Sequence, residues 1–400
     1  MQNIKLIIGA NYGDEGKGLA TDFFGAKAAG RFNVINVLTN GGPQRGHTVE
    51  LSDGRRHVFK HFGAASFRGA ASYFADQFIV NPMEFMREYD DLRAVHETPE
   101  AFVNPRCRFS TPWDILTNQM FSEKNGLHNS CGFGIWETVL RYRKGFGISF
   151  GTFAAMNTED RIAYLRGLRD SYFAERIRGL NAADYFFSDD LLIRFEQDCE
   201  SMLLLCPLRD DEYLRHYQTV LFENAQGLLL DGNSLEGQEF STPSTTGSGR
   251  VTEAAERIFR GADIEICYVT RSYLTRHGDG PMESEITAHK MQTVFPGIKP
   301  DATNTENRFQ GNLRYGMMDV NLLAERIRKD FERCPSSSEN RYRSSVMVTH
   351  LNEYAGVDTE SLARQFGTLY LSDGRTSGDI HIFLRTGTRH AVRTTVSAKL

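Results

Sequence analysis

The chain begins with a short apolar segment that runs directly into a glycine-rich turn and then into a helical pattern. Residues 3–8 (NIKLII) have the length and composition of a buried strand, and residues 9–18 (GANYGDEGKG) follow at once. From residue 19 to residue 29 the apolar side chains recur at helical spacing, and Gly30 predicts the helix end. Such a turn directs backbone N–H groups and the positive end of the helix dipole toward an anion. The opening of the chain therefore predicts an α/β fold whose first turn holds a phosphate group.

Two charged side chains of this turn fit a phosphate with its magnesium ion. Lys17 supplies a mobile positive charge, and Asp14 is a candidate metal ligand or base. The turn is not a Walker A sequence, because Asn11 and Gly18 stand where that pattern requires a glycine and a Ser or Thr. The order of its glycines also excludes the dinucleotide-binding fingerprint. A tight strand-to-helix turn with incidental charges is the simpler alternative.

A second glycine-rich segment, residues 40–48 (NGGPQRGHT), follows the apolar strand expected at residues 34–38. Ligands of open α/β sheets bind outside the carboxyl ends of the strands, so both turns should open at the same sheet edge. His47 would then face Asp14 across one substrate, which is the arrangement that proton transfer requires. Taken alone, His47 is more often a structural hydrogen-bonding residue.

Charge and composition exclude several classes of protein. The 400-residue chain carries a formal net charge of −5, so it offers no basic face to nucleic acid or to a membrane. No apolar run approaches the ~18 residues of a membrane helix, and no signal-peptide pattern is visible. Six scattered cysteines without metal-binding spacing indicate reduced thiols. We therefore expect a cytoplasmic protein that binds neither nucleic acid nor a membrane.

The rest of the chain alternates strands, glycine-rich turns and helical segments. A helical insertion with mostly solvated charges is expected at about residues 155–215, whereas residues 337–343 have the polar composition of an exposed connection. Further strands are expected at residues 219–222 and 264–270, and a strand with its exit at residues 345–352.

Four motifs carry a resemblance to a known family. GDEGKG (13–18), GHT (46–48), FENAQG (222–227) and TRSYLTR (270–276) with Gly280-Pro281 recur in this order in adenylosuccinate synthetases, and the similarity thins after about residue 320. The resemblance implies a P-loop-like, mostly parallel central sheet flanked by helices, with helical and loop insertions. It also implies a single domain over residues 1–400.

The activity implied by the resemblance joins L-aspartate to the 6-oxopurine monophosphate IMP through a 6-phosphoryl intermediate. GTP or ATP supplies the phosphoryl group with Mg²⁺, and the family forms homodimers in which one arginine reaches the site from the partner subunit. Asp14 would remove the N1 proton, Lys17 would stabilise the transferring group, and His47 would assist at the C6 oxygen. Asp14 and Gly46 are the implied metal ligands.

The resemblance assigns further positions to three ligands. The donor nucleotide and its phosphates would contact Gly13, Glu15, Gly16, Lys17, Gly18, Gly46, Thr48, Asn352, Ser372 and Gly374. The acceptor monophosphate would contact Gln44, Ser130, Cys131, Arg141, Arg143, Gln226, Thr245 and Thr246. L-Aspartate would contact Thr303, Arg308 and Arg314.

The sequence departs from the family pattern at informative places. Ser130 and Cys131 replace a pair of threonines, and Glu306 adds a negative charge to the loop that would bind aspartate. Asn352 replaces an aspartate that accepts two hydrogen bonds from guanine. An amide offers one donor and one acceptor, which matches N6 and N1 of adenine, so ATP is a serious candidate donor.

Three alternative interpretations remain open. Some phage relatives act on dGMP and make a 2-aminoadenine precursor, but they replace Asp14 with a small hydroxyl residue, which argues for IMP here. A non-catalytic nucleotide-binding module is disfavoured by the joint presence of Asp14, Lys17 and His47. An ordinary P-loop phosphatase or kinase is disfavoured by the glycine spacing.

Overall fold

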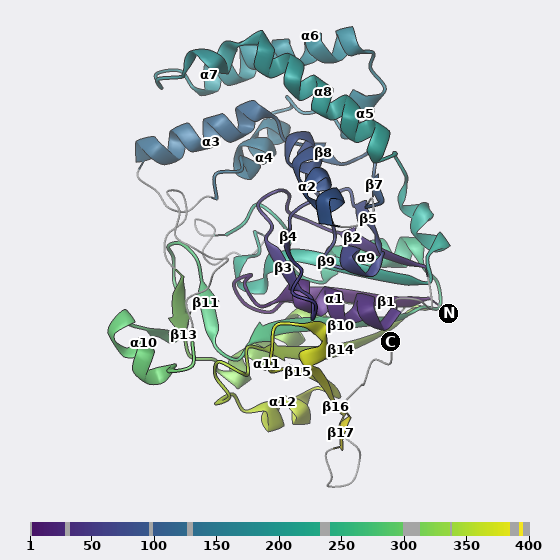
Figure 1. Cartoon of the computed structure of the whole chain (residues 1–400), viewed down its shortest axis with the longest axis vertical. Helices are drawn as coiled ribbons and strands as arrows, with labels where there is room; N and C mark the ends of the chain where they lie inside the picture. Colours follow the sequence, from purple (N-terminus) through teal and green to yellow (C-terminus); the bar gives the residue numbers. More distant parts are fainter. Residues whose placement is uncertain are drawn as a thin grey trace.

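A ten-stranded sheet runs through the centre of the computed structural model of this chain (Figure 1). The structure describes residues 2–28, 33–95, 99–125, 131–232, 241–298, 313–336, 338–384 and 392–394. The strand order is β17-β16-β15-β14-β10-β1-β9-β2-β5-β7. All neighbours from β7 to β15 are parallel, and β16 and β17 add antiparallel pairs at one edge. The predicted fold class, a mostly parallel central sheet flanked by helices, is confirmed.

The strands of this sheet are three to nine residues long, within the usual range for globular proteins. Their bounds are β1 (Asn3–Gly9), β2 (Val34–Leu38), β5 (Ala71–Phe74), β7 (Ala101–Val103), β9 (Thr219–Gly227), β10 (Asp263–Arg271), β14 (Arg341–Thr349), β15 (Thr368–Ser372), β16 (Ile380–Leu384) and β17 (Val392–Thr394).

Helices cover both faces of the sheet, which explains why its central strands are apolar on both sides. On one face Ile4, Leu6 and Ile8 of β1 belong to a core formed with α9 (Gly249–Ile258), α11 (Val320–Phe331) and α12 (Thr359–Gln365). On the other face Ile7 belongs to a core formed with α1 (Lys17–Ala28). The alternation within β1 thus places successive side chains in two different cores.

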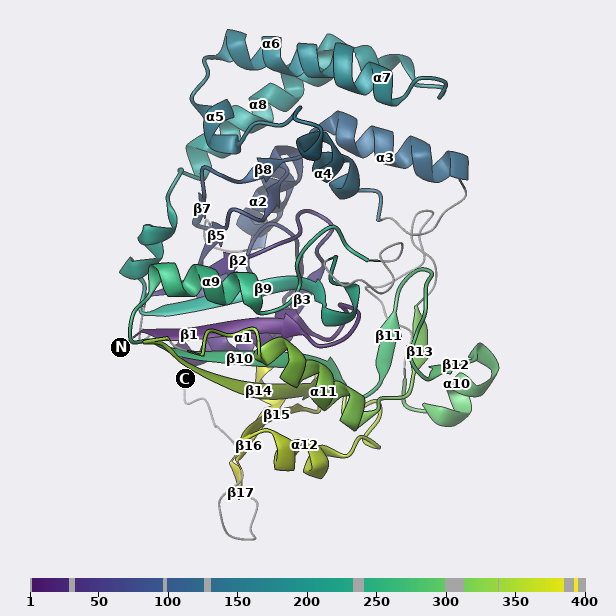
Figure 2. The ribbon, with the colours of Figure 1, turned by 180° about the vertical axis from the view of Figure 1, so that it is seen from behind.

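A largely helical region stands beyond the β7 edge of the sheet (Figure 2). Its elements are α2 (Pro82–Val95), α3 (Pro112–Asn125), α4 (Ile135–Arg143), α5 (Phe150–Ala154), α6 (Thr158–Leu168), α7 (Ala174–Arg176) and α8 (Asp189–Leu205). Of these, α2, α3, α5, α6 and α8 contribute side chains to a second apolar core that also contains residues of β5 and β7, whereas Ile135 and Val139 of α4 belong to a small separate cluster. The expected helical insertion falls within this region. Whether the chain folds as a single domain stays a prediction.

Three small sheets carry the remaining strands. β3 (His47–Glu50) pairs with β4 (Arg56–Phe59), and β6 (Ile79–Val80) pairs with β8 (Arg108–Phe109). β13 (Arg314–Gly316) lies between β11 (Leu274–Arg276) and β12 (Glu285–Ile286), with α10 (Ala288–Val294) following in the chain. Within the described ranges no helix is long and apolar enough to cross a membrane.

Candidate active site

The turn after β1 is held together by the carboxylate of Glu15. This side chain accepts hydrogen bonds from the N–H groups of Asn11 at 3.0 Å and Gly13 at 2.7 Å. A turn whose backbone N–H groups point to one side normally binds an anion. In this turn the anion is the carboxylate of Glu15, which belongs to the turn itself. The predicted phosphate contact of Glu15 can therefore come only from its own N–H group, because its carboxylate organises the turn.

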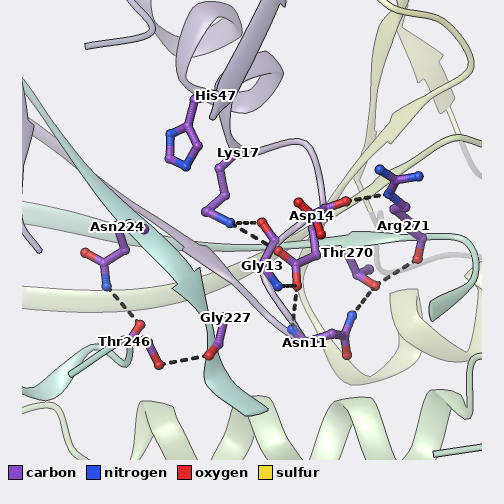
Figure 3. Close-up of polar contacts among 12 residues, drawn as sticks. Asn11, Gly13, Asp14, Lys17, His47, Asn224, Gly227, Thr246, Thr270 and Arg271 are labelled. Carbon is purple, nitrogen blue, oxygen red and sulfur yellow. Dashed lines mark hydrogen bonds and ion pairs between the residues drawn. The ribbon is translucent and has the colours of Figure 1, made fainter. Parts of the chain in front are cut away.

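Lys17 is folded back onto the same turn at the start of α1. Its Nζ donates to the Gly13 carbonyl oxygen and lies 3.2 Å from Glu15, and its side chain has no exposed surface (Figure 3). A buried ammonium group requires such partners, because taking it out of water without them costs on the order of several kcal/mol. Lys17 is thereby held beside the cavity that the turn borders.

Gly18 brings the second glycine-rich loop against the first. A Cβ atom on Gly18 would lie 2.6 Å from the carbonyl oxygen of Thr48 and 2.9 Å from the carbonyl carbon of His47. A side chain cannot fit there, so the glycine permits β3 to pack directly on the start of α1. This contact is the physical reason that the two loops meet.

The His47 ring is buried against Glu223 and Arg45. Its Nδ1 hydrogen-bonds to Glu223, and Arg45 Nη2 lies 3.0 Å from the same carboxylate oxygen. Burial raises the pKa of Glu223, but Arg45 and His47 outweigh it and bring this pKa to about 2. Arg45 Nη2 also lies 2.8 Å from Nδ1, but Arg45 can donate to the carboxylate instead. An ionised carboxylate only accepts hydrogen bonds, so we assign the Nδ1 proton to His47. Glu223 therefore orients the ring and leaves Nε2 for another partner.

The protonation of His47 follows from the same surroundings. Burial, then the positive charge of Arg45, lower its pKa to about 4 against the opposing effect of Glu223. Lys17 adds a further positive charge in the same direction. Without a bound anion the imidazole is therefore neutral at pH 7.

The two loops open into one cavity, called the central cavity below. It is bordered by Gly13, Asp14, Gly16, Lys17, Gly18, Gly46, His47 and Thr48 from the two loops. On its far side it is bordered by Arg271, Tyr273, Tyr315, His350, Asn352, Glu353, Gly374 and Arg375. Asp14 and His47, predicted to face one substrate from separate turns, thus border a single space.

The residues around Asp14 fit a magnesium ion that is bound jointly by the protein and by the phosphates of a nucleotide. The Asp14 side chain is 26% exposed, its backbone carbonyl accepts from Arg271, and Gly46 borders the same cavity. Over the described ranges, no cluster of three or more His, Cys, Asp or Glu forms a ready-made metal site. Mg²⁺ does not require one, because it is usually held by one or two carboxylates, substrate phosphates and water.

The far end of the central cavity contains the residues predicted to read the donor base. His350 has the unusual backbone angle φ of 61°, and Asn352 and Glu353 follow it. Tyr273 donates its hydroxyl to Glu353, so this carboxylate is already engaged. Ser372 is buried and donates to the Gly374 carbonyl at 3.0 Å, so Gly374 rather than Ser372 borders the cavity.

Gln226 stands at the boundary of the first turn. Its φ is 65°, and a Cβ atom on Gly13 would lie 3.3 Å from Gln226 Cα. Non-glycine residues with positive φ are uncommon and cluster at functional sites. Gln44 carries a buried Oε1 without a hydrogen-bond partner among the described residues. Gln226 and Gln44 are not among the residues that border the central cavity.

A second cavity, called the arginine pocket below, lies on the α9 side of the sheet. It is bordered by Thr245 and by Arg108, Arg143 and Arg250, and it shares no bordering residue with the central cavity. It therefore contains two residues predicted to bind the acceptor monophosphate, Arg143 and Thr245.

Three predicted contact residues are instead engaged inside the protein. Arg141 is fully buried and binds both carboxylate oxygens of Asp114 and the Phe109 carbonyl. Thr246 is buried and donates to the Gly227 carbonyl at 3.0 Å. Arg314 binds the carboxylate of Glu285 and two turn carbonyls. Arg141 Nη1 has no hydrogen-bond partner among the described residues, but the other polar groups of these three side chains are bound inside the protein. These side chains therefore act as structural residues in this conformation.

Other predicted residues are placed away from the cavities or cannot be placed. Burial raises the pKa of the Cys131 thiol, which borders neither cavity. Ser130, Thr303 and Arg308 lie outside the described residues, so their predicted contacts stay predictions.

Sequence reasoning missed Glu223 and Arg45, which orient His47. The sequence did contain an indication of the role of Glu223, because a carboxylate at the end of a buried strand requires a charged partner. Arg271 and Tyr273 lie in the TRSYLTR motif but were given no role, and Glu353, also at the far side of the central cavity, was not predicted. Their proximity depends on strands that are distant in sequence, and no local pattern indicates it.

Comparisons with known proteins point in the same direction as the motifs. The family model described as Adenylosuccinate synthetase matches residues 6–330. The adenylosuccinate synthetase of Natronomonas pharaonis is 25% identical over 396 residues, covering 92% of this chain and 82% of that protein. The Borrelia duttonii adenylosuccinate synthetase is 25% identical over 306 residues, covering 71% of this chain and 65% of its relative.

Solved structures show the same fold. The fully ligated adenylosuccinate synthetase from Plasmodium falciparum has a TM-score of 0.68 at 18% identity, covering 89% of this chain and 78% of its own. The cyanophage S-2L succinoaminodeoxyadenylate synthetase PurZ, bound to dGMP and dATP, has a TM-score of 0.63 at 14% identity. That match covers 95% of both chains. With the family model spanning most of its length, this chain belongs to the adenylosuccinate synthetase family of carbon–nitrogen ligases and is a purine nucleotide ligase.

Proposed function

We propose that this ligase joins L-aspartate to IMP, with a nucleoside triphosphate as phosphoryl donor. The observation that carries the proposal is the meeting of Asp14, Lys17 and His47, from two separate loops, around the central cavity. Each of these side chains has a distinct role in the chemistry that the substrate requires.

Asp14 is the proposed base. Its partly exposed carboxylate borders the cavity where it can accept the N1 proton of a 6-oxopurine. Loss of that proton concentrates negative charge on O6, which then attacks the γ-phosphorus of the donor and displaces the nucleoside diphosphate. The step is needed because an oxo oxygen is a poor leaving group until it is phosphorylated.

Lys17 and the backbone N–H groups of the first turn stabilise the transferring phosphoryl group. Lys17 reaches this position by exchanging its contact with the Gly13 carbonyl for a phosphate oxygen. Asp14 and the Gly46 carbonyl would hold a magnesium ion together with the phosphates, and the ion would supply further positive charge there. Phosphoryl transfer depends mainly on this kind of positioning and charge stabilisation.

His47 is the proposed partner of the C6 oxygen. Glu223 keeps Nδ1 occupied, so Nε2 is the ring nitrogen left for the substrate. A bound triphosphate brings negative charge close to the ring and raises its pKa, which opposes the effect of Arg45 and Lys17. The protonated ring then hydrogen-bonds to the phosphorylated oxygen and promotes its departure when the aspartate amine attacks C6.

The proposed donor is ATP in preference to GTP. Asn352 borders the far end of the central cavity, where its amide can pair with N6 and N1 of adenine. For the amine donor, Thr303 and Arg308 remain the proposed aspartate contacts, whereas Arg314 is engaged by Glu285. A homodimer in the cytoplasm is part of the same proposal.

A second candidate acceptor is dGMP. The PurZ structure, which is bound to dGMP and dATP, covers 95% of this chain, so the two chains have similar lengths. Asp14 favours IMP over this alternative, because the 2-amino group of guanine would crowd a carboxylate placed near N1.

A matrix of acceptors and donors tests these assignments. The protein would be incubated with Mg²⁺, L-aspartate, each of IMP, GMP and dGMP, and either ATP or GTP. We expect phosphate release and a product heavier by the aspartyl addition for IMP with ATP. Ligation of dGMP but not IMP would establish the second candidate, and no ligation in any pair would contradict the proposed function.

A further inference from the structure

The far end of the central cavity combines three aromatic rings with a carboxylate. Tyr273, Tyr315 and His350 border it, and the Tyr273 ring centroid lies 6.1 Å from that of Tyr315 and 6.0 Å from that of His350. Glu353 borders the same end. Aromatic rings offer a flat apolar surface to a base, whereas a carboxylate repels phosphate groups. The far end therefore suits the base of a nucleotide whose phosphates lie at Lys17 and the first turn.

The turn that carries Glu353 is tied to the first turn and to its own surroundings. The hydroxyl of Thr349, the last residue of β14, donates to the Glu15 carbonyl oxygen at 2.8 Å. The chain then turns at His350, and the Glu353 N–H donates to the His350 carbonyl oxygen at 3.0 Å. A Cβ atom on Gly297 would lie 2.3 Å from the Glu353 carbonyl oxygen, so another segment packs closely on this turn. These contacts fix where Glu353 stands relative to the phosphate end of the cavity.

One oxygen of the Glu353 carboxylate is held by Tyr273. The Tyr273 hydroxyl donates to Oε2, and Arg271 Nη1 donates to the hydroxyl oxygen at 3.2 Å. Burial raises the pKa of Tyr273 against the opposing charge of Arg271, so the hydroxyl keeps its proton at pH 7 and acts as the donor. In the described part of the chain the other oxygen, Oε1, accepts no hydrogen bond, and Glu353 belongs to no ion pair. Oε1 is therefore left to accept an N–H group of a ligand.

Glu353 follows Asn352 directly, and the two side chains complement each other. Asn352 is exposed and Glu353 is half-buried, and both border the central cavity. When the Asn352 amide pairs with N6 and N1 of adenine, it accepts from one of the two N6–H groups, and the second N–H points away from it. An N–H group without an acceptor weakens binding, and a carboxylate accepts more strongly than a neutral oxygen. The Oε1 atom of Glu353 has the chemistry of this missing acceptor.

We propose that Glu353 recognises the donor purine by accepting a hydrogen bond from its exocyclic amino group. The inference rests on the proposed function and assigns Glu353 as a second base-recognition residue beside Asn352. With ATP this amino group is N6, and with GTP it would be N2. The hydrogen-bond chemistry is the same in both, and the experiment below distinguishes the two donors.

Donor analogues that lack the amino group test the assignment. Purine riboside 5′-triphosphate is ATP without the 6-amino group, and ITP is GTP without the 2-amino group. Each of the four nucleotides would be titrated calorimetrically into the protein with Mg²⁺ but without acceptor or aspartate, so that the readout is binding and not turnover. We expect the wild-type protein to bind ATP about tenfold to hundredfold more tightly than purine riboside triphosphate.

Substitutions of Glu353 separate its contribution from that of Asn352. Glu353→Ala should weaken ATP binding by about tenfold or more and leave the binding of purine riboside triphosphate nearly unchanged. Glu353→Gln keeps an acceptor but loses the charge, so its effect should be intermediate. Glu360→Gln, whose side chain is 86% exposed on α12, is the matched control and should bind all four nucleotides as the wild type does. Circular dichroism would report the fold, and if Glu353→Ala does not fold, Glu353→Gln gives the same comparison.

The pattern of losses decides the outcome. If Glu353 only supports the fold of the cavity, its substitution weakens ATP and purine riboside triphosphate equally, and that result would overturn the proposal. Unchanged affinities for all four nucleotides would overturn it as well. A loss confined to GTP, relative to ITP, would support recognition of an amino group but assign it to guanine, and it would contradict the proposed preference for ATP.

Failure of this inference differs from failure of the proposed function. A wild-type protein that ligates IMP, together with a Glu353→Ala variant that keeps the full preference for ATP over purine riboside triphosphate, would contradict only the role of Glu353. A wild-type protein whose ATP binding depends on Glu353 but which ligates none of the purine monophosphates would contradict only the proposed function.

Discussion

At the scale of single residues, the two proposed proton-transfer groups are held in unlike surroundings. The Asp14 carboxylate is partly exposed at the border of the central cavity, whereas His47 is buried against Glu223 and Arg45. An exposed carboxylate can approach a substrate nitrogen directly. A buried imidazole that is oriented by an ionised partner presents a single ring nitrogen, so its geometry is determined before any ligand binds.

The first prediction concerns these two residues. Asp14→Ala and His47→Ala should each lower the ligation rate by about 10²–10⁴-fold, as expected for loss of a general acid or base. Phosphate release would report the rate, and circular dichroism would report the fold. Asp279→Ala, an exposed aspartate on a nearby turn, is the control and should keep wild-type activity. Near-normal turnover in either test variant would refute its assigned role.

The second prediction concerns the donor base. Initial rates with ATP should exceed those with GTP, and Asn352→Asp should shift the ratio toward GTP by about tenfold or more, because a carboxylate accepts both guanine hydrogen bonds. Asn181→Asp, exposed in the helical region, controls for the added negative charge. A wild-type protein that strongly prefers GTP would show that Asn352 does not read the base as proposed.

At the scale of elements, the first strand, turn and helix were predictable almost to the residue. The expected strand at residues 3–8 and helix from residue 19 correspond to β1 and α1, which begins at Lys17. Apolar periodicity and glycine placement are local properties, and they are the reason for this success. The strand expected at residues 34–38 is likewise β2.

One expected connection was wrong because its stabilising contacts are not local. Residues 341–343 were expected in an exposed polar segment, but they form the first part of β14 beside β10. Arg341 pairs with Asp263 at 2.8 Å, and Arg343 pairs with Glu265 at 2.9 Å across the strands. Charged residues in one strand are stabilised by opposite charges in the next, which only the strand order reveals.

The third prediction tests how the two loops are joined. Gly18→Ala should weaken binding of the donor nucleotide and lower activity. The new Cβ atom would lie 2.6 Å from the carbonyl oxygen of Thr48, so the second loop would have to move away from the first. Gly167→Ala, in α6 with no atom near its Cβ position, is the matched control. That substitution should stabilise the protein by about 0.5–1 kcal/mol through helix propensity. Normal nucleotide affinity in Gly18→Ala would show that the loops do not depend on this contact.

At the scale of the whole molecule, a buried histidine couples stability to pH. His61 is fully buried and accepts a hydrogen bond from the Asn81 N–H at 2.9 Å. Burial, then the positive charges of Arg45 and Lys60, lower its pKa to about 3 from an ordinary value of 6.5. Between those values the unfolded chain binds a proton that the folded chain excludes. Acid therefore destabilises the fold across this range.

The fourth prediction follows from that difference. The free energy of unfolding should fall as pH decreases from about 6.5 toward 4, with His61 contributing up to about 1.4 kcal/mol per pH unit. Urea titrations at several pH values would measure it. His61→Gln, which can still accept from Asn81, should flatten the dependence, whereas exposed His216→Gln should not. An unchanged slope in His61→Gln would contradict the assignment.

The sequence by itself determined the fold class and the loops that carry Asp14, Lys17 and His47. It could do so because strand length, helical periodicity and glycine turns are encoded by neighbouring residues. Only the tertiary structure decided which arginines are free to bind an anion. Arg141 and Arg143 are two residues apart, yet one is paired with Asp114 in the interior and the other borders the arginine pocket. The partner of a charged side chain usually comes from a distant segment, and packing, rather than local pattern, brings the two together.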